Sequence, residues 1–229
     1  MVNKTLTNNR KLAIISGLSL LLMAILAGYG YGYVFQNIYI ANSGSDTLYN
    51  LRHSEFMFRL FQYAFILVFV LDVVVSCTLY LFFRQVSKKL SLFTALFRLI
   101  YSVVLLIALL KTSEVLSLLH DVNCSECLIM NGLGDFLNVW SLGLILFGGH
   151  LLLLGVLILK SVYVPDYLGV LVVIASVCYI ITNVANLLIP DYTNYKETVD
   201  MILSAPMAIG ELALAVWLVF KGAKVKYGS

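Results

Sequence analysis

Long apolar segments alternate with short polar ones along the whole chain. Roughly 20 apolar residues in a helix cross the hydrocarbon core of a bilayer, which is about 30 Å thick. Each long segment reaches that length, and the polar segments between them are short. The pattern therefore predicts an all-α bundle of six transmembrane helices, formed by a single domain over residues 1–229, with helices at about 12–32, 55–83, 90–119, 135–160, 167–189 and 201–220.

Composition supports this interpretation. The chain is 61% hydrophobic and 12% charged, with a mean hydropathy of +0.96, whereas soluble domains are nearer half apolar and a quarter charged. We therefore expect an integral membrane protein whose main partner is the lipid bilayer. The chain has no basic or arginine-rich stretch, so we do not expect it to bind nucleic acid.

The basic residues indicate an orientation. Short loops rich in Lys and Arg face the cytoplasm. With the N-terminus inside, the opposite side of the membrane holds only Arg52 and Lys196. We therefore expect a multi-pass protein of the cytoplasmic (inner) membrane with both termini in the cytoplasm. The basic residues that this orientation places inside are Lys4, Arg10, Lys11, Arg84, Lys88, Lys89, Lys160, Lys221, Lys224 and Lys226.

Four ionisable residues lie deep inside the apolar segments. At a helix rise of 1.5 Å per residue, they are about 13 to 18 Å from the nearest basic residue on the cytoplasmic side. A lone charge there costs at least roughly 2.5–3.5 kcal/mol, so such residues mark candidate functional sites and are expected to pair. We expect Arg98 to pair with Asp72 or Glu211, and His150 to bridge to the remaining carboxylate. The midplane cluster is thus Asp72, Arg98, His150 and Glu211.

Two helices carry polar or small residues at helical spacing next to this cluster. On the fifth predicted helix, Asn183 and Asn186 extend a stripe that includes Ser176 and Tyr179. Residues three and four apart share one face of a helix. We therefore add Asn183 and Asn186 to the candidate ligand or proton-relay residues. On the sixth helix, the corresponding face holds Ser204, Ala208, Glu211 and Ala215.

Charged residues also lie nearer the outer ends of the second and third helices. Arg59 is positioned to meet Glu114 on the neighbouring helix, and Lys111 and Glu114 are three residues apart. Such spacing places two side chains on one helix face. These three residues are candidates for outer ion pairs.

Three interpretations of the midplane cluster remain open. The buried pairs could only fix the packing of the bundle, as in a structural or sensor protein. They could instead bind a small molecule or lipid in a proton-linked way, because histidine titrates near neutral pH and is flanked by carboxylates. A metal-dependent intramembrane enzyme would use His150, Asp72 and Glu211, although catalytic zinc sites usually have more histidine or cysteine ligands. We name no catalytic residue, metal ligand or cofactor.

The sequence contains no hydrolase triad signature, zinc-protease motif, P-loop or dinucleotide motif. An enzyme is therefore not our first expectation. Cys124 and Cys127 form a C-x-x-C motif in the loop before the fourth predicted helix. A disulfide is possible on the oxidising side of the membrane, and redox or metal chemistry would need a further motif. We expect a local disulfide at most.

Sequence elements spread over nearly the whole chain resemble a family of bacterial and archaeal membrane proteins, domain of unknown function 4386. The resemblance implies a six-helix membrane fold and no particular activity. It places Arg59, Asp72, Arg98, His150 and Glu211 inside the shared motifs. The C-x-x-C motif and Asp166 depart from the family pattern. The matching elements are Phe58-Arg59-Leu60, Asp72, Leu79-Tyr80 to Arg84, Phe97-Arg98-Leu99, Phe147-Gly148-Gly149-His150-Leu151 to Gly155, Pro165, Leu168-Gly169-Val170, Asn183 to Pro190, Gly210-Glu211-Leu212 and Trp217.

Overall fold

The computed structural model of the chain describes all residues except 1, 120–124, 190–192 and 223–229, and it describes the side chains of residues 9–119, 125–189 and 198–222. Within these ranges the chain forms helices and no strand. Six helices are long and apolar enough to cross a membrane. The predicted all-α fold with six transmembrane helices is therefore confirmed.

The first span is a continuous rod built from α1 (Val2–Ala27), the π-helical segment η1 (Gly28–Phe35) and the short α2 (Gln36–Ile38). The later spans agree with the apolar segments of the sequence, and the second matches residue for residue. They are α4 (Glu55–Phe83), α5 (Lys88–Leu118), α6 (Glu126–Leu159), α7 (Asp166–Leu188) and α8 (Thr193–Phe220).

Several predicted boundaries are wrong. The first span continues to Ile38, beyond the expected end near Gly32, and the sixth begins at Thr193, before the expected start near Met201. The polar segment after the first span was expected to be a loop, but residues Gly44–His53 form α3, an amphipathic helix. The fourth span begins at Glu126, well before the expected start near Asp135. The formation of α3 and the early start of α6 have one cause: α3 packs on the extended start of α6, where Gly44 lies against Glu126 and Met130. Tertiary contact thus stabilises helix in segments whose polarity suggested a loop.

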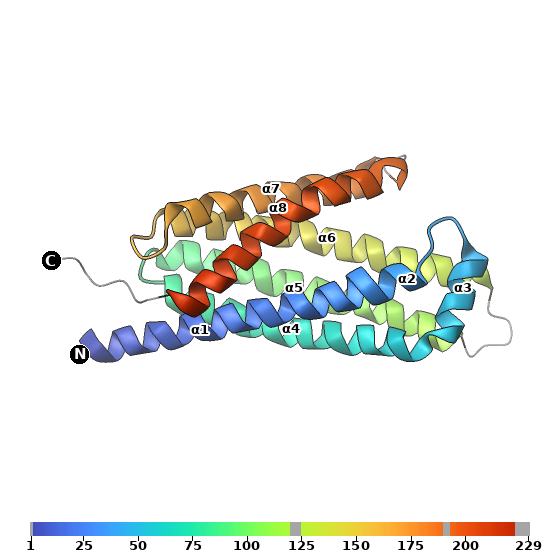
Figure 1. Cartoon of the computed structure of the whole chain (residues 1–229), viewed down its shortest axis with the longest axis horizontal. Coiled ribbons are helices and arrows are strands. Elements are labelled where there is room, and N and C mark those ends of the chain that lie inside the picture. The colour runs from blue at the N-terminus through green and yellow to red at the C-terminus, as the bar shows by residue number, and fades with distance from the viewer. Residues whose placement is uncertain (1, 120–124, 190–192, 223–229) are drawn as a thin grey trace.

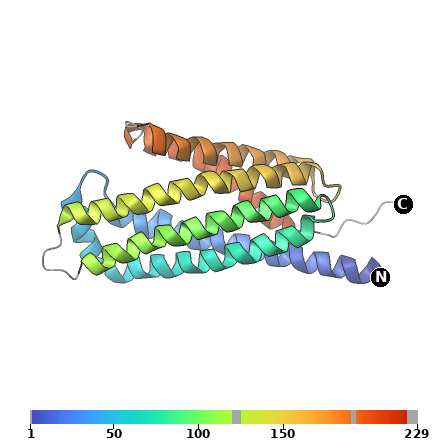
Figure 2. The ribbon, with the colours of Figure 1, turned by 180° about the vertical axis from the view of Figure 1, so that it is seen from behind.

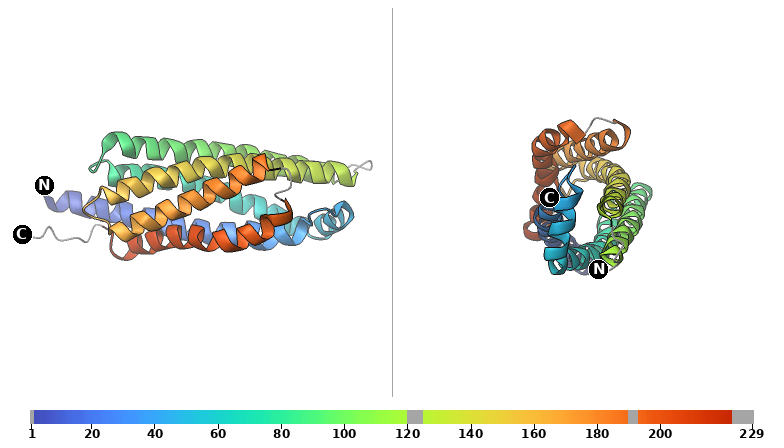
Figure 3. Two further views of the ribbon diagram at one scale, coloured as in Figure 1. Left: turned by 90° about the horizontal axis from the view of Figure 1, so that it is seen from above. Right: turned by 90° about the vertical axis from the view of Figure 1, so that its right-hand side faces the viewer.

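The six spans form a ring. Around it, α1 contacts α4, α4 contacts α5, α5 contacts α6, α6 contacts α7, α7 contacts α8, and α8 returns to α1. Figure 1 and Figure 2 show the two faces of this bundle, and the end-on view in Figure 3 shows the helices arranged around a centre. The start of α1 and the end of α8 lie at the same end of the bundle (Figure 1).

Glycines make several of the helix seams tight. A Cβ atom added to Gly148 of α6 would lie 3.2 Å from the carbonyl oxygen of Ser176 in α7, and one added to Gly155 would lie 3.0 Å from that of Gly169. Small residues let transmembrane helices approach closely. Close approach stabilises the bundle because helices in lipid associate through van der Waals contact and not through the hydrophobic effect. The sequence motif around His150 thus fixes α6 against α7.

Serines hold the α4–α5 seam instead. Ser76 donates a hydrogen bond to the carbonyl oxygen of Ala95 at 2.9 Å, and Ser91 donates to that of Tyr80 at 3.0 Å. Such interhelical hydrogen bonds satisfy polar groups that lipid cannot. They set the register that brings Asp72 of α4 level with Arg98 of α5.

Candidate functional site

The centre of the site is an ion pair between α4 and α5. Arg98 Nη2 lies 2.7 Å from Asp72 Oδ1, and both side chains are almost completely buried, with 1% and 0% exposed. A buried charge needs a partner because desolvation is costly. Of the two pairings that the sequence left open for Arg98, the structure has the one with Asp72.

His150 of α6 holds the other side of Arg98. Its Nε2 atom lies 3.1 Å from Arg98 Nη1, and its Nδ1 atom lies 2.8 Å from the carbonyl oxygen of Thr94. A guanidinium has only donors and a carbonyl only accepts. His150 must therefore accept at Nε2 and donate from Nδ1–H, which makes it a neutral imidazole with one defined tautomer.

The expected bridge from His150 to a carboxylate is wrong. Both ring nitrogens face other groups, because Arg98 lies between the imidazole and Asp72. The metal-site hypothesis also finds no support in this geometry, since both possible histidine ligand atoms are engaged. Among the described residues, no three His, Cys, Asp or Glu side chains gather as a metal site would require.

Two apolar side chains complete the surroundings of Arg98. Its guanidinium carbon lies 5.3 Å from the ring centroid of Phe147, a cation–π arrangement. Nη2 also lies 4.0 Å from the Met23 sulfur of α1. Some polar atoms of the ion pair make no hydrogen bond. Within the described chain, Arg98 Nε and both Asp72 oxygens lack a hydrogen-bond partner of good geometry. Buried polar atoms of this kind are where a water or ligand group binds.

Glu211 of α8 lies on another side of the cluster. Tyr179 of α7 donates a hydrogen bond of 2.7 Å to Glu211 Oε1. Glu211 is also close enough to Arg98 and Asp72 for electrostatic interaction. Unlike the ion pair, it is only half-buried. Glu211 is therefore less fully enclosed than Asp72 and Arg98.

Two tyrosines belong to this site although the sequence prediction did not include them. Tyr179 was noted only as part of a polar stripe, and Tyr101 not at all. Tyr101 interacts electrostatically with Asp72, Arg98 and Glu211, and its ring packs 4.9 Å from that of Phe147. Tyr101 follows Arg98 by three residues, so helical spacing from the buried arginine was the available signal.

The two asparagines lie farther along α7 and serve other contacts. Asn183 donates to the carbonyl oxygen of Tyr179 on its own helix at 2.8 Å. Asn186 donates to the hydroxyl of Ser141 in α6 at 3.0 Å. The described hydrogen bonds of Asn183 thus stay within α7, and that of Asn186 joins α7 to α6. Asn183 and Asn186 remain candidate ligand residues, behind the four residues of the midplane cluster.

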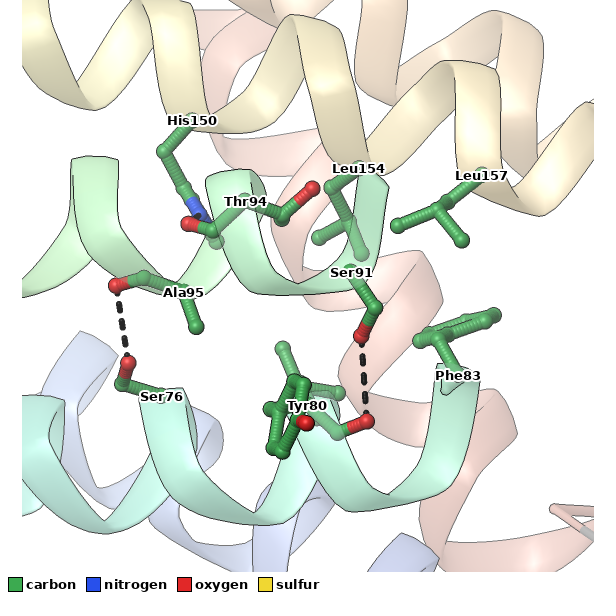
Figure 4. A pocket seen from close by; sticks show the side chains of 10 residues that line it. Ser76, Tyr80, Phe83, Ser91, Thr94, Ala95, His150, Leu154 and Leu157 are labelled. Carbon is green, nitrogen blue, oxygen red and sulfur yellow. Dashed lines mark hydrogen bonds between the residues drawn. The ribbon is translucent and has the colours of Figure 1, made fainter. Parts of the chain in front are cut away.

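A narrow pocket lies on the other side of His150, between α4, α5 and α6. It contains about 200 Å³ of empty space, with no part wide enough for a water molecule. Figure 4 shows its lining, which includes the hydroxyl side chains of Ser76, Ser91 and Thr94 together with His150 and Phe83. His150 thus separates this pocket from the ion pair.

The outer charged residues form local pairs. Lys111 and Glu114 pair at 3.0 Å, as their spacing indicated. The expected contact between Arg59 and Glu114 is wrong, because Arg59 pairs at 2.7 Å with Glu55, one turn earlier on α4. All four side chains are substantially exposed. Such pairs contribute little in water, and they lie outside the midplane site.

The proposed disulfide cannot be placed, because Cys124 lies outside the described residues. Cys127 is exposed in the first turn of α6, and its sulfur accepts a hydrogen bond from Asn131 at 3.6 Å. Cys127 lies at the start of α6, many helical turns before His150.

These features define a class: a multi-pass α-helical membrane protein with a buried polar cluster between its spans. Residues 15–222 match the family described as "Domain of unknown function (DUF4386)", and the chain belongs to that family. A protein of Archaeoglobus fulgidus that carries the name "Uncharacterized protein" is 36% identical over 159 residues, which cover 69% of this chain and 82% of the relative. No solved structure matches the chain.

Proposed function

We propose that this protein binds a small molecule or lipid at the midplane cluster and couples that binding, or its transport, to protons. One observation carries the proposal: in the described chain, Glu211 has no basic side chain as a hydrogen-bonded partner, since the guanidinium of Arg98 is already paired with Asp72. The cluster holds two carboxylates and a single permanent cation.

This imbalance has a chemical consequence. An ionised carboxylate at membrane depth without a counter-charge is strongly disfavoured. Glu211 is therefore neutralised by a bound proton or by a cationic ligand, and Tyr179 stabilises either state by its hydrogen bond. Exchange between the two couples proton release to ligand binding. The half-buried position of Glu211 supports this role.

The proposal includes a location and an orientation. The protein lies in the cytoplasmic membrane with both termini in the cytoplasm. Two observations support this: the start of α1 and the end of α8 lie at the same end of the bundle, and basic residues gather in the sequence segments at that end.

A structural role is the second candidate function, because Arg98 is held on several sides. Asp72, His150, Phe147 and Met23 all contact its guanidinium group. Under this alternative the cluster fixes helix register, and its protons never exchange.

Infrared spectroscopy of the protein in lipid distinguishes proton-linked binding from the structural role. We expect a protonated-carboxyl band that disappears reversibly as the pH is raised and that is missing in Glu211→Gln. Glu114→Gln is the matched control, because Glu114 is 61% exposed and outside the site. A Glu211 band that does not change with pH until the protein unfolds would contradict the proposal and support the structural role.

A further inference from the structure

The narrow pocket between α4, α5 and α6 extends from the midplane cluster toward one end of the bundle. Its deepest lining residues include Ser76 and His150, and its shallowest include Phe83, the last residue of α4, and Leu157, close to the end of α6. The turn after α4 is at the same end of the bundle as the start of α1 and the end of α8 (Figure 2), named here the terminal end. The pocket therefore leads from the terminal end to the midplane cluster.

The inner end of the pocket is one helical turn from the buried ion pair. Ser76 follows Asp72 by four residues on α4, and Ala95 precedes Arg98 by three residues on α5. Residues at these spacings are neighbours on one helix face. Within the described chain, both Asp72 oxygens and Arg98 Nε are buried and lack a hydrogen-bond partner. Buried water binds to polar atoms of this kind, and here a cavity leads toward them.

Three hydroxyl groups line the pocket, and each uses its hydrogen within the protein. Ser76 and Ser91 donate across the α4–α5 seam, as the dashed lines in Figure 4 show. Thr94 donates to the carbonyl oxygen of Leu90 on its own helix at 2.8 Å. A hydroxyl has one donor and two acceptor lone pairs. The three oxygens can therefore still accept, and such a lining suits a small species that donates hydrogen bonds, namely water or hydronium.

We propose that this pocket is a water-binding site that opens at the terminal end of the bundle and lets protons reach the midplane cluster from that side. The inference rests on the proposed function and adds the route of its proton. The pocket contains about 200 Å³ of space, and a water molecule occupies about 30 Å³ in the liquid. No part of the pocket is as wide as a water molecule. The structure therefore has the closed form, and widening of the pocket admits a short file of water molecules.

Apolar side chains keep the pocket closed. Phe83, Leu154 and Leu157 line it and are at most 2% exposed. A buried water needs room and two to four polar partners, so these side chains exclude water where they meet. Their movement controls when water enters, and the closed form prevents a continuous leak of protons through the bundle.

The route passes beside His150 and not through it. Its Nε2 atom accepts from Arg98 and its Nδ1 atom donates to the carbonyl oxygen of Thr94, so the ring cannot relay a proton in this arrangement. Ser76 offers a way along α4 to Asp72 instead. Tyr101 then interacts electrostatically with both Asp72 and Glu211. The ionisable groups around the inner end are Asp72 of α4, Arg98 and Tyr101 of α5, His150 of α6, Tyr179 of α7 and Glu211 of α8, whereas α1 contributes Met23, which does not titrate.

Access of silver ions to a cysteine in the pocket tests the site. Silver ions travel through water, and a thiol that binds silver is protected from a maleimide added after denaturation. Ser91→Cys places the thiol in the pocket. Ser102→Cys is the matched control, because Ser102 is equally buried on α5 but bonds to the carbonyl oxygen of Arg98 and does not line the pocket. In sealed vesicles of known orientation, we expect silver to protect Ser91→Cys only from the terminal side. The native cysteines Cys77, Cys124, Cys127 and Cys178 are replaced by serine in both variants.

Two further substitutions test the closing side chains and the lining. Leu157→Ala should speed silver protection of Ser91→Cys by widening the pocket, whereas Leu214→Ala, at a buried position of α8 outside the pocket, should not.

Thr94→Val removes one acceptor from the lining and keeps its shape. After a pH jump on the terminal side, it should slow the change of the Glu211 infrared band by roughly 2- to 10-fold, the range for one neutral hydrogen bond. Thr112→Val is the control, because Thr112 is also buried on α5 and donates to its own helix but lies outside the pocket.

Each outcome has a distinct meaning. The pocket is overturned as a water site if silver never protects Ser91→Cys, even with Leu157→Ala, or protects Ser102→Cys equally well. Silver access together with a pH-insensitive Glu211 band supports the water site and refutes the proton-linked function, and with it the passage of protons. A pH-sensitive band without silver access, or one that responds as fast in Thr94→Val as in Thr112→Val, keeps the proton-linked function and refutes this route.

Discussion

His150 Nε2 lies 3.1 Å from Arg98 Nη1, and this contact decides the chemistry of the imidazole. Because the guanidinium can only donate, the ring must accept there. His150 therefore positions Arg98 and cannot be protonated at Nε2 while the contact lasts. Any movement of a proton onto that atom requires Arg98 to move away.

The first prediction concerns this contact. His150→Leu leaves the Arg98 donor without its acceptor and should lower the free energy of unfolding by roughly 1.5–3 kcal/mol, the range for hydrogen bonds to charged groups. His150→Gln supplies an amide oxygen and should recover part of the loss. Thermal unfolding in detergent measures both, and equal losses in the two variants would contradict the acceptor role.

The second prediction concerns the buried ion pair. Arg98→Met alone leaves the Asp72 charge uncompensated and should destabilise the protein by about 3–5 kcal/mol. The double variant Asp72→Leu with Arg98→Met removes both charges and should restore most of that stability. Unfolding midpoints of the single and double variants test this. A double variant as unstable as the single one would show that the pair does not account for the cost.

The third prediction concerns the glycines in the helix seams. Gly17→Ala should destabilise by about 1–3 kcal/mol, because the new Cβ overlaps the backbone oxygen of Ala215. Gly134→Ala is the control, since nothing lies within 4 Å of its added Cβ. That variant should be neutral or stabilising by roughly 0.5–1 kcal/mol, because glycine weakens a helix. The unfolding midpoint of Gly17→Ala should therefore fall and that of Gly134→Ala should not, and an equal fall in both would contradict the role of the seam.

The fourth prediction concerns the end of α8. Arg10 donates hydrogen bonds to the carbonyl oxygens of Leu218, Val219 and Gly222. A cation there also offsets the negative end of the helix dipole. Arg10→Ala should therefore increase hydrogen exchange of the Lys221 and Gly222 amides, whereas Lys11→Ala, at an exposed neighbour, should not. Unchanged exchange in Arg10→Ala would refute the role of this contact.

The fifth prediction concerns orientation. Reporters that fluoresce only in the cytoplasm should be active when fused at either terminus, and a periplasmic phosphatase should be inactive there. A phosphatase inserted between residues 44 and 53 should be active, because α3 lies at the other end of the bundle. The reverse pattern would overturn the orientation that the basic residues indicate.

Apolar runs alone determined the six spans, because a bilayer requires a minimum length of apolar helix whatever the neighbours are. The depth of Asp72, Arg98, His150 and Glu211 also follows from sequence, since helix rise is constant. Sequence could not predict α3 or the early start of α6. Those helical segments depend on contacts with each other, which no local pattern records.

Only the tertiary structure decided which of the four midplane residues contact one another. Their similar depth makes contact possible, but the rotation of each helix about its own axis determines which side chains meet. That rotation places Arg98 between Asp72 and His150 and leaves Glu211 with Tyr179 on the far side. The divergence of α8 from α1 seen in Figure 1 depends on where small residues let two helices touch. Whether two helices touch in this way depends on both helix surfaces together, so neither sequence segment alone predicts it.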